Sequence, residues 1–285
     1  MKRNEFLKLT GGLALAGLAS KSALASLAGS DAKLNNFGLQ LWSVREDLAK
    51  DPKGVLKQLS SYGYKQIESF EGAKGMFWGM TNKEFKAEMD NLGMKIVSSH
   101  CDITKDFEKK AAEAAEIGMK YLICPWKGPQ KSLDNFKQFA DEFNQKGEIC
   151  KKNGIRFAYH NHDYSFAQMD GQFPQDIMMK NTDPKLVDFE MDMYWVITGG
   201  QDIETWLYKY KNRFRLCHVK DRKKNTTEKD ASCDLGTGAI DYPKILKSAK
   251  KAGVQYFIVE QEKWDNSTPM KSAQVDAAYM KGLNI

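Results

Sequence analysis

The sequence predicts an α/β chain that folds as one (βα)8 barrel, or TIM barrel, behind a short N-terminal signal. Short apolar runs alternate with amphipathic stretches from Asn35 onward. A glycine stands shortly before several of these runs, where a left-handed residue would end the preceding helix. Eight such units in about 250 residues are typical of a closed barrel.

The first 28 residues have the pattern of an export signal. A charged start is followed by the apolar stretch 13–19 and by small residues near 23–28. This pattern is typical of a signal peptide cleaved near 25–28, not of a membrane span. The start resembles a twin-arginine signal, with Asn4 in place of the second arginine, so Tat and Sec routes both stay open. We therefore expect residues 29–285 to form an exported, periplasmic barrel without stable membrane insertion.

The apolar and amphipathic segments define the expected elements. The predicted strands are 37–42, 64–69, 94–100, 120–124, 155–160, 187–191, 214–219 and 256–260. The predicted helices are 52–62, 82–92, 107–117, 133–152, 173–180, 203–210, 242–251 and 270–283. An open doubly wound sheet is the alternative, but it needs a glycine-rich turn after the first strand, and residues 41–45 contain no glycine.

Charge and cysteine content exclude several function classes. The chain carries a net charge of +6, of which four basic residues and one acidic residue of the signal account for +3. The remaining charge near +3 is no footprint of nucleic-acid binding. The five cysteines are widely spaced without a Cys-x-x-Cys pair, which argues against a disulfide framework or a thiolate zinc site.

The segment 154–163 ends an apolar run in two histidines, an amide and a carboxylate. Side chains alternate along a strand, so His160 and His162 share one face with Arg156 and Ala158. In a (βα)8 barrel the chemistry lies at the carboxyl ends of the strands. The fifth strand is therefore predicted to deliver imidazoles to the site.

All four histidines of the chain fall at such strand ends. His100 ends the third predicted strand, His160 and His162 end the fifth, and His218 ends the seventh. Histidines placed for packing alone have no reason to gather at one end of a barrel. We interpret the cluster as a functional site.

Acidic residues follow the same pattern. Asp188, Glu190 and Asp192 alternate on one face of the sixth strand, and Glu260 ends the eighth. Carboxylates facing one lumen repel each other unless a cation lies among them, which predicts a divalent metal. Imidazole and carboxylate ligands favour Mn, Zn or Co, while an oxygen-rich set would take Mg.

Six segments carry a family resemblance over nearly the whole mature chain. They are QLWSVR at 40–45, YHNHDY at 159–164, EMDMYW at 190–195, HVKD at 218–221, LGTGAID at 235–241 and VEQ at 259–261. In this order they resemble the xylose-isomerase-like barrel superfamily, in particular its exported sugar phosphate isomerase/epimerase branch. The resemblance implies a metal held by four residues of strands five to eight: His160, Asp192, His218 and Glu260.

The chain departs from the family pattern on strand five. Better-known sugar epimerases carry a glutamate at the place of His160, and it works with the strand-eight glutamate, here Glu260, in proton transfer. Glu190 lies on the same face as Asp192 and can restore a carboxylate, as a ligand or as the base. His160 is accordingly either a ligand or the acid/base.

Other residues are expected to contact a substrate. Lys220, two residues beyond His218 on the same face, can polarise a substrate oxygen, although a solvated loop lysine is the alternative because the basic run 222–224 follows. Aromatic faces at strand ends suit the C–H faces of a sugar ring. The predicted substrate contacts are Trp42, His100, His162 and Trp195.

The resulting functional hypothesis is a metal-dependent sugar isomerase or epimerase. A catalytic set of His160, Glu190, Lys220 and Glu260 would remove a proton next to a carbonyl through an enediolate. One alternative is a lyase or hydrolase that releases the aglycone from 3-keto-glycosides, and another is an exported sugar-binding protein without catalysis. The expected partner is a small carbohydrate and no nucleic acid; the oligomeric state is not predicted.

Overall fold

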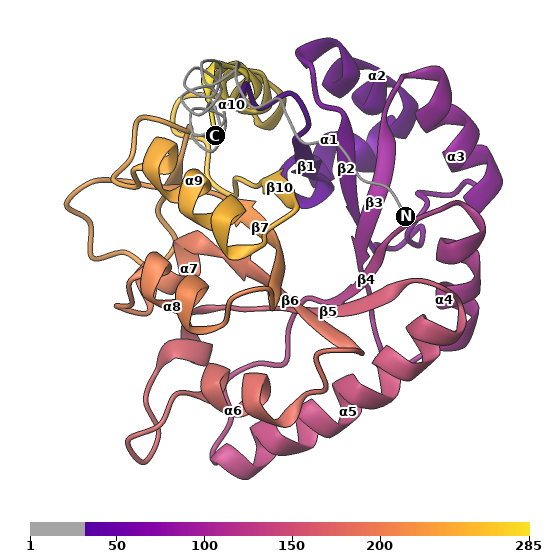
Figure 1. Ribbon diagram of the computed structural model, residues 1–285. Helices are drawn as coiled ribbons and strands as arrows, with labels where there is room; N and C mark the ends of the chain where they lie inside the picture. The colour runs from indigo at the N-terminus through magenta and orange to yellow at the C-terminus, as the bar shows by residue number, and fades with distance from the viewer. Residues whose placement is uncertain (1–31) are drawn as a thin grey trace, which may run out of the picture. The chain divides into compact units, whose positions relative to one another are not determined.

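The computed structural model describes residues 32–285, which form a closed barrel of eight parallel strands (Figure 1). The strands are β1 (Gly38–Gln40), β2 (Gln66–Phe70), β3 (Lys95–His100), β4 (Tyr121–Cys124), β5 (Arg156–His160), β6 (Val187–Asp192), β7 (Phe214–Val219) and β10 (Tyr256–Val259). Each strand pairs with its sequence neighbours, and β10 closes the ring onto β1. The predicted barrel is confirmed. The predicted signal, 1–28, lies outside the described residues, so export stays a prediction.

Helices cover the outside of the barrel (Figure 1). The eight expected ones are α2 (Pro52–Tyr62), α3 (Asn82–Asn91), α4 (Phe107–Glu116), α5 (Leu133–Lys152), α6 (Pro174–Asn181), α8 (Ile203–Lys209), α9 (Tyr242–Ala252) and α10 (Pro269–Gly282). Local sequence sets their ends: Thr81 and Glu84 form a capping box at α3, and left-handed Gly63 and Gly253 end α2 and α9. Within 32–285, none of the helices combines the length and apolarity needed to cross a bilayer.

Several short elements were not predicted. They are η1 (Leu41–Val44), α1 (Arg45–Lys50), η2 (Asp163–Phe166) and α7 (Met193–Thr198). Each spans less than two turns, which is too short for a helical period to appear in the sequence. The segment 220–237 contains an antiparallel pair, β8 (Asp221–Arg222) with β9 (Ser232–Cys233).

The lumen of the barrel changes character along its axis. Its middle is filled by a small apolar cluster that includes Tyr121, Ala158 and Leu216. At the amino end Arg156 pairs with Asp188, which also accepts a hydrogen bond from Tyr121 at 3.1 Å. Asp188 therefore belongs to the amino end of the lumen. A site must be formed by the polar side chains nearer the carboxyl ends of the strands.

Candidate metal centre

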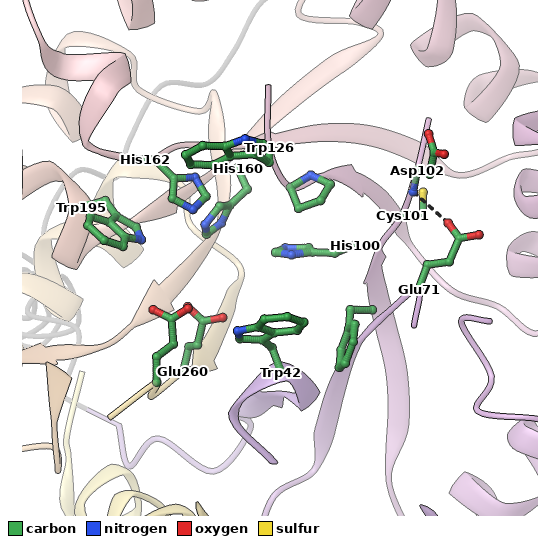
Figure 2. Close-up of a pocket in the computed structure, with 13 residues that line it drawn as sticks. Trp42, Glu71, His100, Cys101, Asp102, Trp126, His160, His162, Trp195 and Glu260 are labelled. Carbon is green, nitrogen blue, oxygen red and sulfur yellow. Dashed lines mark hydrogen bonds between the residues drawn. The ribbon is translucent and has the colours of Figure 1, made fainter. Parts of the chain in front are cut away.

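A cavity of about 340 Å³ opens at the carboxyl ends of the strands (Figure 2). This volume lies within the range of small-molecule sites. Of the predicted metal ligands, His160 and Glu260 reach its wall. Besides Trp126, the wall includes all four residues that were predicted to contact a substrate: Trp42, His100, His162 and Trp195.

Three imidazoles meet at the base of this cavity. β3, β5 and β7 each place one histidine in the lumen, and the ring centroids of His100, His160 and His218 lie between 4.5 and 5.5 Å apart. All three side chains are buried. The fourth histidine, His162, lies on the wall with its ring 4.9 Å from that of His160.

Two buried carboxylates, those of Glu190 and Glu68, contact one edge of each ring, which we call the inner edge. Glu190 Oε2 lies 3.0 Å from Nδ1 of His160 and 2.8 Å from Nε2 of His100. Glu68 Oε1 lies 2.7 Å from Nε2 of His218. A carboxylate facing one ring nitrogen favours the tautomer that carries its proton there, which leaves the other nitrogen of His160 and of His218 free to act as a ligand.

Glu68 was missed in the sequence. It is fully buried within β2 and accepts hydrogen bonds from Gln40 Nε2 at 2.8 Å and Ser98 Oγ at 2.6 Å. A carboxylate inside a strand that also carries Ile67 and Phe70 is costly to bury unless it is paired. The isolated acid in Ile67-Glu68-Ser69-Phe70 was therefore the signal that could have revealed it.

The outer edges of two rings face a second pair of carboxylates. Nδ1 of His218 lies 3.2 Å from Glu260 Oε2 and 3.7 Å from Asp192 Oδ2. Nε2 of His160 lies 3.9 Å from the same Asp192 oxygen. Ligand atoms that bind a tetrahedral cation at about 2.0–2.2 Å are about 3.3–3.6 Å apart. Asp192, His218 and Glu260 bring ligand atoms within 4.8 Å of one another, and His160 lies beside this group through Asp192.

The hydrogen-bond partners of Asp192 show whether these side chains fit a cation. Its Oδ1 accepts a hydrogen bond from the backbone N–H of Trp195 at 3.0 Å and caps α7. Its buried Oδ2 has no hydrogen-bond partner among residues 32–285. A buried carboxylate oxygen without a donor is costly, and a cation beside it removes that cost. The buried His/Glu/Asp cluster is consistent with a divalent metal.

The inner edges of the rings offer a competing position. His100, His160, His218 and Glu190 also bring ligand atoms within 4.8 Å of one another, and Glu190 Oε1 lacks a partner within the described chain. However, Glu190 Oε2 already pairs with two ring nitrogens at 2.8 and 3.0 Å, which is hydrogen-bond spacing. These hydrogen bonds, together with the Asp192 oxygen that lacks a donor, favour the outer set as the metal position.

Protons occupy this cluster when no cation does. Burial disfavours a charged His100, yet Glu68 and Glu190 raise its pKa to about 9. Burial also opposes a charged His218, but Glu190 and Glu260 raise the pKa of that ring well above its usual 6.5. Burial and the neighbouring His218 lower the pKa of His160 well below 6.5. A cation must displace the proton of His218, so metal affinity should fall as the pH is lowered.

Lys220 lies behind the cavity wall, not on it. Its buried ammonium contacts Glu262, lies 3.4 Å from Glu260 Oε2, and sits 4.8 and 5.0 Å from the ring centroids of Tyr194 and Trp195. Lys220 was expected to polarise a substrate oxygen, but its ammonium does not line the cavity. Glu262, a wall carboxylate for which no role was predicted, pairs with it instead.

Comparisons with known proteins agree with this fold. Residues 56–283 match the family described as xylose isomerase-like TIM barrel. A sugar phosphate isomerase/epimerase structure from Parabacteroides distasonis is similar, with a TM-score of 0.74 and 29% identity over 89% of this chain and 95% of that one. A zinc-bound structure of the IOLI protein shares the fold, with a TM-score of 0.69 and 13% identity over 85% and 95% of the two chains.

Curated relatives match over a shorter part of the chain. An inosose dehydratase of Geobacillus kaustophilus is 23% identical over 186 residues, which are 63% of this chain and 57% of that protein. The chain thus spans little more than half the length of this relative. Because the family match itself extends over most of the barrel, we conclude that the protein belongs to the xylose isomerase-like TIM barrel family.

Proposed function

We propose that the protein is a divalent-metal-dependent enzyme that moves a proton next to the carbonyl group of a sugar, as an isomerase or epimerase does. The observation that carries this proposal is the outer ligand set around the unpaired Oδ2 of Asp192. The name of the similar Parabacteroides distasonis structure, a sugar phosphate isomerase/epimerase, supports the same reaction class.

The outer set would hold the metal through His160, Asp192, His218 and Glu260. Two imidazoles and two carboxylates suit zinc, manganese or cobalt. When bound, such a cation supplies a Lewis acid that stabilises negative charge on a carbonyl oxygen. Because His160 and Glu260 line the cavity, a substrate can approach the set from that side.

Glu262 is the residue best placed to take the proton. It lines the cavity, lies outside the ligand set, and its side chain is 26% exposed. Burial and the neighbouring Glu260 raise the pKa of the Glu262 carboxyl, which makes its ionised form a stronger proton acceptor, and the Lys220 ammonium that contacts it from behind the wall opposes part of that rise. Lys220 is then a positioning residue. Glu190, by contrast, is sealed beneath His160 and orients that ring.

Glu262→Gln is expected to lower kcat by about 10²- to 10⁴-fold, the usual contribution of a general base. Glutamine keeps the size of the side chain, so metal content should stay unchanged. Turnover and metal content measured on the same preparation check this. Glu142→Gln is the matched control, because Glu142 is 27% exposed and also pairs with a lysine, at 2.5 Å from Lys127. Equal losses in both variants would contradict the assignment.

Glu190→Gln distinguishes a Glu190 that orients His160 from a Glu190 that is itself a metal ligand. If Glu190 holds His160 from behind, its replacement should weaken metal binding by about 10- to 100-fold, and Glu68→Gln should act similarly through His218. A competition titration against a chelator measures this. Complete loss of the metal in Glu190→Gln would instead make Glu190 a ligand and move the metal to the inner edges of the rings.

Elimination is a second candidate outcome of the same proton removal. His160 stands where a second proton-transferring glutamate is expected, which weakens a two-base epimerisation. The Geobacillus kaustophilus relative is an inosose dehydratase. After proton removal, a leaving group on the neighbouring carbon would depart, either as water or as the aglycone of a 3-keto-glycoside.

Product analysis in D2O distinguishes these outcomes. The metal-loaded protein is incubated with a ketohexose, an inosose and a 3-keto-glycoside. Rearrangement without mass loss and with deuterium next to the carbonyl supports the isomerase or epimerase. Release of water or aglycone supports elimination. Binding without any deuterium uptake would contradict the proposal and leave a sugar-binding protein without catalysis.

A further inference from the structure

We propose that the cavity binds an uncharged sugar that carries a second ring, and that it disfavours a sugar phosphate. The sugar would lie at the end of the cavity near Glu260, so this part rests on the proposed function. The second ring would occupy an outer subsite on the cavity wall made by Trp42, Phe70, Pro125 and Trp126.

The charges on the wall argue against a phosphate. Within the described chain, no lysine or arginine lines the cavity, whereas four carboxylates do: Glu71, Asp102, Glu260 and Glu262. A phosphate group needs cationic or N–H donors to replace its water. A carboxylate-lined wall instead repels it, and most strongly at low ionic strength.

The cations on and beside the cavity wall are already paired. His100, which lines the wall and has a pKa raised to about 9, lies 3.2 Å from Glu68 and 2.8 Å from Glu190. Lys220 lies between Glu260 and Glu262. Lys110 Nζ lies 2.7 Å from Glu71 Oε2 and donates to the carbonyl oxygen of Asp102 at 2.8 Å. Withdrawing either lysine toward a phosphate would leave a partly buried carboxylate unpaired, which is costly.

The nearest arginine is engaged as well. Arg45 stacks its guanidinium 4.7 Å from the ring centroid of Trp42 and 5.4 Å from that of Trp264, and it donates to the Trp42 carbonyl oxygen at 3.0 Å. This side chain is not part of the cavity wall. Its role here is to support Trp42.

The outer subsite extends the cavity beyond the ligand set. Figure 2 shows Trp42 and Trp126 on opposite sides of His100, with Glu260 toward one end and Glu71 toward the other. The two tryptophans are 40% and 53% exposed, and they belong to the few large apolar side chains that the described chain leaves exposed. Exposed apolar surface grouped at a cavity mouth is typical of a binding site.

Both tryptophans are held in place by neighbouring rings. Trp42 packs edge-on against Phe70 at 5.0 Å between centroids. Trp126 packs edge-on against His162 at 4.5 Å and Tyr164 at 4.8 Å. Preorganised aromatic faces favour a flat partner, because little side-chain freedom is lost on binding. The second ring can be a sugar with an apolar face or an aryl group.

Calorimetric titration of the metal-loaded protein tests this proposal. The ligands are methyl β-glucoside, phenyl β-glucoside, cellobiose, glucose and glucose 6-phosphate. We expect phenyl β-glucoside or cellobiose to bind at least about tenfold tighter than methyl β-glucoside. Whichever of the two binds tighter identifies the second ring as aryl or sugar. Glucose 6-phosphate should bind more weakly than glucose, by a margin that shrinks with added salt.

Two tryptophan variants show which side chains cause the affinity advantage of a second ring. Trp42→Ala and Trp126→Ala should bring the ratio of the affinities for the two-ring ligand and for methyl β-glucoside close to one. Tyr208→Ala is the control, because Tyr208 is 49% exposed and lies outside the cavity wall. Tighter binding of glucose 6-phosphate, no advantage of a second ring, or an advantage that survives both tryptophan changes would overturn the proposal. Repeating the titration with chelated protein separates the two claims, since the second-ring advantage does not require the metal.

Discussion

Asp192→Asn is expected to abolish metal binding and to lower kcat/KM by at least about 10³-fold, or about 4 kcal/mol of transition-state stabilisation. The reason is that Oδ2 is the ligand atom with no other partner among the described residues. An amide nitrogen in its place cannot bind a cation. Asparagine keeps an oxygen that can accept from the backbone N–H of Trp195, so the cap of α7 and the fold should survive.

Asp202→Asn is the matched control for this change. Asp202 caps α8 through the same contact, with its Oδ1 2.7 Å from the backbone nitrogen of Thr205. It lies outside the cavity wall. Elemental analysis, turnover and circular dichroism should show a normal metal content in Asp202→Asn and none in Asp192→Asn. An Asp192→Asn protein that keeps both its metal and its activity would refute the ligand assignment.

Lys220→Met is expected to lower the free energy of unfolding by about 3–5 kcal/mol, the usual cost of removing one partner of a buried ion pair. Glu260 and Glu262 would face each other across the vacated space without a compensating cation. A bound metal should offset part of this cost at Glu260, so the loss should be larger in chelated protein. Urea unfolding with and without chelator measures the difference.

Lys137→Met provides the comparison for this stability effect. Lys137 also pairs with a carboxylate, at 2.8 Å from Asp134, but both side chains are exposed, at 53% and 79%. Exposed ion pairs contribute about 0–1 kcal/mol, so this variant should unfold nearly as the parent does. A Lys220→Met protein as stable as Lys137→Met would show that the buried ammonium does not hold the two glutamates in place.

The barrel could be predicted because its strands and helices are long enough to show a period in hydrophobicity. Strands such as β3 and helices such as α5 carry a clear period in hydrophobicity, and glycines such as Gly63 mark helix ends. The short elements after the strands carry no such signal. α7 begins at Met193 because Asp192 caps it, which depends on a single side chain.

The site could be predicted only in part. Strand alternation brings His160, Asp192, His218 and Glu260 to one end of the lumen, so their grouping follows from sequence. Which ring nitrogen faces which carboxylate depends on side-chain rotation, so this pairing does not follow from the sequence. That geometry favours His160 over Glu190 as the proposed ligand. Neither Glu68 nor Glu262 belongs to a repeating pattern, so their roles emerge only from contacts between distant strands.

The position of the cation tests the central claim most directly. A crystal of the protein loaded with zinc or manganese, measured for anomalous scattering, locates the metal independently of activity. We predict one cation per chain, bonded to Nε2 of His160, Oδ2 of Asp192, Nδ1 of His218 and Oε2 of Glu260 at about 2.0–2.2 Å. A cation between His100 and Glu190 on the inner edges of the rings, or no cation in the barrel at all, would contradict the account.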